Sequence, residues 1–408
     1  MKRRLGFILA LVLVFALAVA LVGCNGDNGN EANGDDTTTF VIGFGGPLTQ
    51  GAVGFGQGAL RATELAVDRA NASAEAQELG IQFRIAEGDD QSDPLRANTV
   101  ANALISERDL VGIVGHFNSG VTDPAGEIYH EHGVVQISYG STRVDLTHMG
   151  RENFFRTCGT DDLQGPALAD AAYALGFRSA AIINDSSPYG VGLREEFVNH
   201  WNTLDGTSVV LDEETQQAQS EFGPVVTRVR SLDPDVVFFA GTYDATSGAG
   251  ALFARQMADG GVEAPVLGGD GIQKDGFIEE AGPGAEGTIA TLPGLPFDLM
   301  PGGESFVAGY TEMFPGETPG GFDGAAYDAT NVIIQAVFAV ARENGVDNVA
   351  TTAGRRAIIE YVTDITIEGL SGPLSFTENG DINNPVVTTY EVVDGEWVVH
   401  PDIEIWTR

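Results

Sequence analysis

Two turns rich in small hydroxyl side chains are the residues of this chain best suited to bind a small anion. The first turn, residues 115–120 (GHFNSG), follows the apolar run 110–114, and the second, residues 139–142 (YGST), follows the apolar run 134–138. Such runs indicate buried parallel strands, and open α/β sheets bind ligands at the carboxyl ends of their strands. Hydroxyl groups, glycine-loosened amides and a helix N-terminus favour a carboxylate. Either turn alone could be an ordinary helix cap, but two turns one repeat apart favour a binding site.

Other patterns that could carry chemistry are weaker. His130 and His132 lie two residues apart, which on a helix places them about 200° apart around the axis, so they indicate surface residues and not a shared metal site. Glycines at residues 51–58 precede a predicted helix, but the last position of a dinucleotide fingerprint holds Ala59. No Gly-x-Ser-x-Gly elbow occurs, and the histidines offer no obvious base for the serines of the two turns. We therefore expect no catalytic residue, no metal and no cofactor.

The elements that would position these turns alternate between apolar runs and amphipathic stretches. Residues 122–131, between the two turns, predict a helix with Thr122 as its cap and Pro124 in its first turn. Strand and helix patterns alternate from residue 40 to residue 138 and again from residue 162 to residue 268, which predicts two doubly wound Rossmann-like lobes and not a barrel. The last third predicts a strand at 288–292, a long helix at 325–343, a helix at 355–362 and a hairpin at 386–399.

Charge and cysteine content exclude several classes of function. The formal net charge is −37, which repels nucleic acid and anionic lipid headgroups. Lys274 is the only lysine after Lys2, and no P-loop sequence occurs. Only Cys158 follows Cys24, so no disulfide can form within the mature chain. Acidic residues exceed basic ones so far that a saline habitat is a reasonable hypothesis, because salt screens self-repulsion.

The N-terminal residues predict an exported lipoprotein. Lys2, Arg3 and Arg4 precede an uncharged stretch at residues 5–22, and Leu21-Val22-Gly23-Cys24 fits a lipobox in which Cys24 is lipidated. We therefore expect residues 1–23 to be a signal peptide; the alternative is an uncleaved membrane anchor, since the stretch is near the lower limit for a span. Residues 24–39 are polar and predict a flexible tether. The domain would be held at the outer face of the cytoplasmic membrane through its N-terminal lipid.

Nearly the whole mature chain resembles the leucine/isoleucine/valine-binding proteins of bacterial ABC importers. The motifs that carry this resemblance are Gly46-Pro47, Asp89-Asp90, Asp93-Pro94, Gly115-His116, Pro124-Ala125, Ile128-Tyr129, Gly133, Ser141-Thr142, Leu146-Thr147, residues 162–166, Tyr189-Gly190 and Ala285-Glu286-Gly287. The resemblance implies a type I periplasmic-binding fold whose chain crosses between lobes near Arg156, Ala285 and Thr363. Lobe 1 would comprise residues 40–156 and 285–362, and lobe 2 residues 157–284 and 363–408. Several relatives carry a disulfide where this chain has Ser92 and Asn118.

The resemblance also implies the roles of the site residues. The ligand carboxylate would meet the residues that resemble the first-lobe hydroxyls and amides, namely Ser119, Gly140, Ser141 and Thr142. The ligand ammonium would meet Asp270, and a charge-assisted hydrogen bond to an acid suits that cation. Tyr189 and Tyr243 resemble tyrosines that close over the ligand, and Phe55 and Asn118 lie at positions that vary with the ligand side chain. The aromatic residues could equally be core residues, and Asp270 could be a turn residue before Gly271.

These expectations describe a monomeric, non-enzymatic solute-binding protein. It would capture an amino acid with an aliphatic, branched side chain and deliver it to an ABC permease. Within the same class, the ligand could instead be an amide, a urea-like compound or an aromatic acid. A sensor ectodomain and an extracytoplasmic hydrolase are the alternatives from other classes.

Overall fold

A computed structural model describes residues 37–401, 403 and 405–407. The predicted signal peptide, Cys24 and most of the predicted tether lie outside the described residues. Within the described residues, three sheets are formed, of which two carry the architecture and the third is a two-stranded ribbon.

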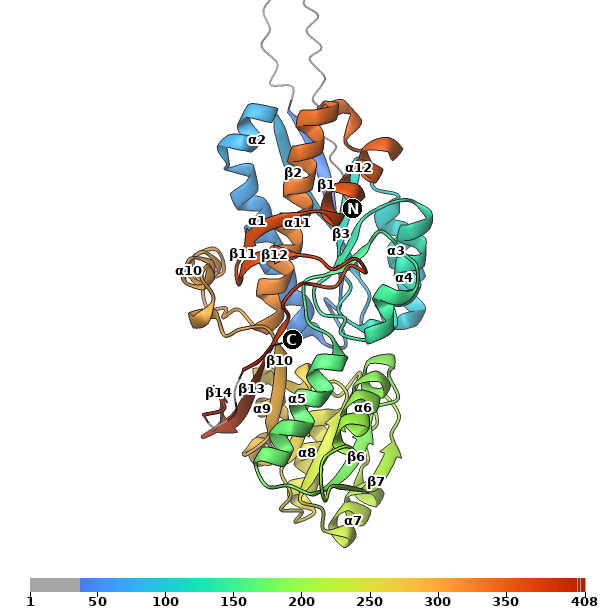
Figure 1. Ribbon diagram of the computed structural model, residues 1–408, viewed down its shortest axis with the longest axis vertical. Coiled ribbons are helices and arrows are strands. Elements are labelled where there is room, and N and C mark those ends of the chain that lie inside the picture. The colour runs from blue at the N-terminus through green and yellow to red at the C-terminus, as the bar shows by residue number, and fades with distance from the viewer. Residues whose placement is uncertain (1–36, 402, 404, 408) are drawn as a thin grey trace, which may run out of the picture. The chain divides into compact units, whose positions relative to one another are not determined.

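The first sheet has five parallel strands in the order β2-β1-β3-β4-β5 (Figure 1). They are β1 (Thr38–Gly46), β2 (Ile81–Asp89), β3 (Leu110–Val114), β4 (Gln136–Ser138) and β5 (Phe154–Arg156). Its helices are α1 (Val53–Asn71), α2 (Ala74–Leu79), α3 (Pro94–Ile105), α4 (Ser119–Glu131), α10 (Gly303–Met313), α11 (Gly321–Asn344) and α12 (Thr352–Thr363).

Both faces of this sheet are buried, which explains its nearly continuous apolar strands. In β1, Phe40, Ile42 and Phe44 belong to the cluster formed with α1 and α11, whereas Val41 belongs to the cluster formed with α3 and α4. This alternation follows from the period of two in a strand. Figure 1 shows α1 and α11 on one side of the strands and α3 and α4 on the other.

The second sheet has eight strands, and its parallel part runs β7-β6-β8-β9-β10. The strands are β6 (Ser179–Asn184), β7 (Ser208–Glu214), β8 (Val236–Ala240), β9 (Val266–Gly268), β10 (Ile289–Pro293), β13 (Val386–Val393), β14 (Glu396–Val399) and β15 (Trp406–Thr407), the last three being antiparallel to their neighbours. The helices are α5 (Asp161–Ala174), α6 (Pro188–Trp201), α7 (Gly223–Leu232), α8 (Gly250–Asp259) and α9 (Asp275–Ala281). The hairpin predicted at residues 386–399 is present as β13 and β14.

The two parallel arrangements repeat one strand order, which confirms the prediction of two doubly wound lobes. In each, the first strand lies between the second and the third, so the connections leaving the first and third strands diverge to opposite faces. A crevice forms at such a switch point, outside the carboxyl ends of the strands. The two switch points lie after β1 and β3 in the first sheet and after β6 and β8 in the second.

The chain passes between the two sheets after β5, after β10 and in the segment that precedes β13. A Cβ atom on Gly159 would lie 3.3 Å from Pro293 Cβ and 3.6 Å from Pro385 Cβ, so these three segments run beside one another. Arg156 N also donates a hydrogen bond to Gly380 O at 3.0 Å. These segments form the three-strand hinge of the fold.

Two sequence predictions about these elements differ from the structure. The helix after the first turn begins at Ser119 with Asn118 at the cap position, not at Thr122; the Thr122 hydroxyl instead lies 2.5 Å from Ser141 Oγ in the interior. The resemblance predicts that residues 285–362 belong to the first lobe, but β10 pairs with β9 and β13, so residues 289–293 belong to the second sheet. The apolar sequence of β10 would suit either sheet, and only its pairing with β9 and β13 assigns it to the second sheet.

The sequence predictions also omitted the ribbon of β11 (Thr366–Gly369) and β12 (Gly372–Ser375). The structure adds five short 3-10 helices, η1 (Val144–His148), η2 (Asp270–Ile272), η3 (Gly282–Ala285), η4 (Phe297–Leu299) and η5 (Val346–Asn348). Among the described helices, α11 is the one long and apolar enough to cross a membrane, but 72% of its most apolar window is buried, as expected of a core helix.

Candidate ligand-binding site

A small cavity lies where the two switch points face one another. Its volume is about 20 Å³, which is about the room that one water molecule needs. Its lining comes from the turns after β2, β3, β6, β7 and β8, namely Ser92, Pro94, Asn118, Ser119, Gly120, Asp185, Ser187, Pro188, Tyr189, Gln217 and Thr242. The cavity as it stands is therefore too small to hold a ligand with more than a few heavy atoms.

The two hydroxyl-rich turns are tied together by hydrogen bonds. Ser141 Oγ lies 2.9 Å from Phe117 O and 3.1 Å from His116 O, and Ser138 Oγ donates to His116 O at 2.7 Å. The His116 ring is itself fixed, because Nδ1 lies 2.7 Å from Asp90 Oδ2 and Nε2 lies 3.0 Å from Tyr129 OH. The Ser141 side chain therefore holds the two turns in register, and its role toward a ligand stays a prediction.

Other groups of these turns keep free hydrogen-bonding capacity. Asn118 Oδ1 is buried without a partner among the described residues, and the first N–H groups of α4 have no partner within the helix. Ser119 is 2% exposed, and its Oγ accepts a hydrogen bond from Arg143 N at 3.3 Å. Thr142 Oγ1 is also buried, and it interacts with the Asp161 carboxyl. The first N–H groups of α4 and the Ser119 hydroxyl are donors suited to a carboxylate, whereas the Asn118 oxygen is an acceptor.

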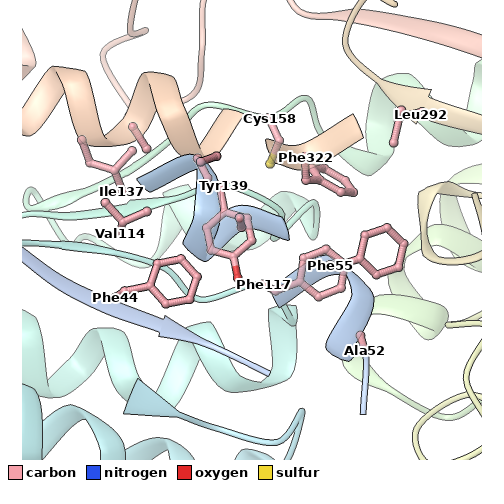
Figure 2. Packing of buried hydrophobic residues seen from close by; sticks show 14 of the residues in the cluster. Phe44, Ala52, Phe55, Val114, Phe117, Ile137, Tyr139, Cys158, Leu292 and Phe322 are labelled. Carbon is pink, nitrogen blue, oxygen red and sulfur yellow. The ribbon is translucent and has the colours of Figure 1, made fainter. Parts of the chain in front are cut away.

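Aromatic rings cover the first-sheet side of the site. Phe55 and Phe117 stack with ring centroids 4.7 Å apart, and Phe322 meets both edge-on at 5.9 and 5.5 Å. Phe117 also stacks on Tyr139 with ring centroids 6.1 Å apart, and Figure 2 shows both residues among the buried side chains of this cluster. A Cβ atom on Gly140 would lie 2.4 Å from the Phe117 ring, so the ring requires glycine at that position. Side chains thus fill the space beside Phe55.

Asp270 is the centre of the second-sheet side. It is 2% exposed, and its Oδ1 accepts hydrogen bonds from Gln164 Nε2 at 2.6 Å and from Tyr189 OH at 2.9 Å. Tyr189 OH in turn accepts from Gly271 N, and Gln164 Oε1 accepts from Asp270 N. These bonds fix the carboxylate, so Asp270 is more than a turn residue.

The sequence predictions missed Asp161 and Gln164. Asp161, the first residue of α5, is fully buried, and Gln164 Nε2 lies 3.3 Å from its Oδ1 as well as 2.6 Å from Asp270 Oδ1. Asp161 N donates to Thr142 O at 2.9 Å, so the acid is attached to the second hydroxyl-rich turn. Two consecutive acids beginning a helix resemble ordinary capping, and only the buried position marks Asp161 as a site residue.

Burial raises the pKa of both acids. The pKa of Asp270 is raised from 3.8 to about 6 by loss of solvent, although the hydrogen bonds from Gln164 and Tyr189 lower it. Burial also raises the pKa of Asp161 well above its usual range; the nearby Asp270 charge raises it further, while the Thr142 hydroxyl lowers it. Neither acid forms an ion pair with any described residue, so a cation is the group that would stabilise their charged forms.

The remaining predicted residues link the two sides. Phe55 contacts the edge of the Tyr243 ring with centroids 6.0 Å apart, and Gly51 N donates to Thr246 Oγ1 at 3.1 Å. Asn118, Ser119 and Tyr189 line the small cavity together. Three of the predicted residues therefore meet at the cavity, and Phe55 and Tyr243 are in contact with each other. No group of three or more His, Cys, Asp or Glu side chains suited to a metal occurs among the described residues.

Two lobes whose switch points face one another across a small cavity define a two-lobed solute-binding protein, not an enzyme. Residues 39–396 match the family model described as periplasmic binding protein, and the chain belongs to that family. The family implies an extracytoplasmic location. The structure of the described residues therefore defines the fold, and the relatives that follow narrow the class of protein.

Two curated relatives cover most of the chain. A Leu/Ile/Val-binding protein homolog 2 of Brucella abortus is 32% identical over 371 residues, covering 89% of this chain and 93% of its own. An amino acid binding protein of Pseudomonas aeruginosa is 30% identical, with 86% and 89% covered.

Solved structures agree in fold. The leucine binding protein LivK of Thermotoga maritima has a TM-score of 0.76 at 25% identity, covering 89% of this chain and 99% of its own. A solute binding protein of R. palustris in complex with benzoate has a TM-score of 0.77 at 22% identity, covering 89% and 95%. At that identity the second structure supports the fold alone.

Proposed function

We propose that this protein is a lipid-anchored solute-binding protein that captures an aliphatic, branched amino acid by lobe closure and delivers it to an ABC permease. The observation that carries the proposal is the pair of buried acids Asp270 and Asp161, of which Asp270 lies on the second-sheet side and Asp161 is hydrogen-bonded to the second hydroxyl-rich turn. An amino acid zwitterion carries both charges that such a site would bind, an ammonium for the acids and a carboxylate for the turns.

Each side of the site holds one end of the ligand in this proposal. The carboxylate binds the α4 N-terminus, Ser119 and Thr142, and the ammonium binds Asp270 with Asp161 beside it. Only the closed form holds both ends, so ligand binding selects closure. The relatives' names, which specify Leu/Ile/Val or amino acid binding, support the ligand class.

The lipid anchor, the permease and the monomeric state belong to the proposal as well. The lipobox ending at Cys24 supports the anchor. Membership of the periplasmic binding protein family supports delivery to a permease. Size-exclusion chromatography with light scattering tests the monomer, and labelling with a radioactive fatty acid that disappears in Cys24→Ala tests the lipid.

An aromatic acid is the second candidate ligand, because Phe55, Phe117 and Phe322 offer an aromatic wall. Solute binding proteins of R. palustris and Rhodopseudomonas palustris with the same fold hold benzoate, 4-hydroxybenzoate and 3,4-dihydroxybenzoate. A benzoate would bring a third negative group beside two buried acids without the cation that offsets them. The acids therefore favour the amino acid.

Calorimetric titration of purified protein with leucine, isoleucine, valine and benzoate tests the ligand class. We expect micromolar binding of an amino acid, roughly −8 kcal/mol, and no heat with benzoate. Benzoate binding without amino acid binding would overturn the proposed ligand but leave the class of solute-binding protein unchanged. If none of these compounds binds and the protein releases product from an added ester or amide, the assignment as a solute-binding protein would be overturned.

A further inference from the structure

A second cavity, larger than the one between the switch points, lies at the hinge. Its volume is about 350 Å³, within the range of about 300–1,000 Å³ that is common for small-molecule sites. All three crossing segments line it, through residues 157–159, 293–295 and 382–386. Helix α11 and the β11–β12 ribbon complete the wall. We call this space the hinge cavity.

The lining of the hinge cavity is mainly apolar and carries one charged side chain. Pro293, Leu295, Met300, Leu374 and Pro385 supply apolar surface, and the lining contains no Lys, Arg or His. The charged side chain is Asp328 of α11, which is 7% exposed. A buried carboxylate in an apolar wall is costly unless a cation or several hydrogen bonds stabilise it.

Asp328 has little stabilisation within the protein. Its two oxygens share a single donor, Leu370 N, at 3.0 and 3.1 Å. It forms no ion pair with any described residue. Burial raises its pKa to about 7, although the Leu370 amide lowers it. The hydrogen bond from Leu370 N requires only an acceptor at this position, and an asparagine oxygen would supply one. This bond therefore does not explain why the side chain is an acid.

We propose that the hinge cavity binds a small organic ammonium ion, with the ammonium on Asp328 and the hydrocarbon body against the prolines and leucines of the crossing segments. An ammonium has three donors and no acceptor, which complements a carboxylate that accepts one hydrogen bond. Asn383, Asn384 and Ser371 in the same lining can accept the remaining N–H groups. The formal net charge of −37 favours the approach of a cation over that of an anion.

This site is separate from the amino acid site. The residues that line the hinge cavity and those that line the cavity between the switch points have no member in common. Because every crossing segment contributes, occupation of the hinge cavity depends on the angle between the lobes. The amine would therefore change amino acid affinity, and the amino acid would change amine affinity by the same factor.

Calorimetric titration with cyclohexylamine at pH 8 tests the proposal, and cyclohexanol is the neutral match in size. We expect saturable binding of the amine only, weakened at least tenfold by Asp328→Asn, which keeps an acceptor for Leu370 N. Asp364→Asn, which removes the same charge from an exposed position, should leave binding unchanged. Ala325→Leu should also block binding, because its side chain enters the cavity while Asp328 remains.

The amine could instead occupy the amino acid site, so Asp270→Asn is the decisive comparison. Loss of amine binding in Asp270→Asn with retention in Asp328→Asn would overturn the proposal, as would equal binding of cyclohexanol or no binding at all. Urea unfolding midpoints of each variant distinguish loss of the site from loss of the fold. The result does not depend on whether leucine binds.

Discussion

Lys274 Nζ lies 5.4 Å from the centroid of the Phe55 ring. Lys274 follows η2 on the second-sheet side, whereas Phe55 belongs to α1 on the first-sheet side. The Lys274 charge also lowers the pKa of the buried Asp323, although burial raises that pKa to about 6 overall. Lys274, the only lysine after Lys2, therefore interacts with α1 and α11 on the first-sheet side, next to the site.

Replacing Lys274 should weaken amino acid binding. A cation over an aromatic ring contributes about 0.5–2 kcal/mol, so Lys274→Met should raise Kd by roughly two- to thirtyfold. Lys274→Arg should retain most of the affinity, because the charge and the ring contact both persist. Arg356→Met removes an exposed charge and serves as the control. Equal affinity of Lys274→Met and wild-type protein in calorimetry would refute the role of this contact.

Asp270→Asn should weaken ligand binding without destabilising the empty protein. The variant loses a hydrogen bond to a charged group, about 1.5–3 kcal/mol, so the affinity should fall by roughly ten- to 150-fold. It also removes a buried charge, so the free energy of unfolding without ligand should stay constant or rise. Chemical denaturation and calorimetry on the same samples measure both quantities. A variant that binds leucine as tightly as the parent protein would show that the ammonium lies elsewhere.

The raised pKa of Asp270 predicts opposite pH trends for folding and binding. Because the folded pKa of about 6 exceeds the ordinary value of 3.8, the folded state binds more protons between these values. Stability without ligand should therefore fall as pH rises from about 4 to about 6. The ligand ammonium favours the charged acid, so affinity should rise across the same range and binding should release protons.

Titrations in buffers of different ionisation enthalpy measure that proton release. Asp270→Asn should reduce it, leaving the part that comes from Asp161. A proton uptake in place of release would contradict the assignment of an ammonium to this pair of acids.

Removing the His116 ring should destabilise the fold. His116→Phe leaves Asp90 Oδ2 and Tyr129 OH without their buried hydrogen-bond partner, and each buried polar group left without a partner costs about 1–3 kcal/mol. Urea denaturation measures this loss, and His132→Phe, at an exposed position, is the matched control. A loss below about 1 kcal/mol would mean that the turn is held by Ser138 and Ser141 alone.

The acidic surface predicts stabilisation by salt. At a formal net charge of −37, self-repulsion is strong in dilute buffer and is screened as ionic strength rises. The thermal midpoint should therefore increase between dilute buffer and molar sodium chloride. A midpoint that stays constant would argue against a saline habitat.

Local sequence patterns determined much of this protein. Apolar runs predicted the strands around the two turns, because a strand buried on both faces must be apolar along its length. The alternation of strands and helices predicted two doubly wound lobes, and the strand ends identified the turns after β3 and β4 that are hydrogen-bonded to each other. Asn118, Ser119, Tyr189 and Asp270 were predicted as site residues from a resemblance that spans most of the chain.

Tertiary structure decided what depends on distant neighbours. The assignment of β10 to the second sheet follows from its pairing with β9 and β13, which no local pattern encodes. Asp161 looks like a helix-capping acid until burial beside Asp270 makes it part of the site. The sequence predicts a ligand-binding hydroxyl at Ser141, and only the folded chain shows that this hydroxyl also lies 3.1 Å from His116 O and 2.9 Å from Phe117 O. Hydrogen bonds and burial join residues remote in sequence, so only the folded chain reveals which polar groups remain free.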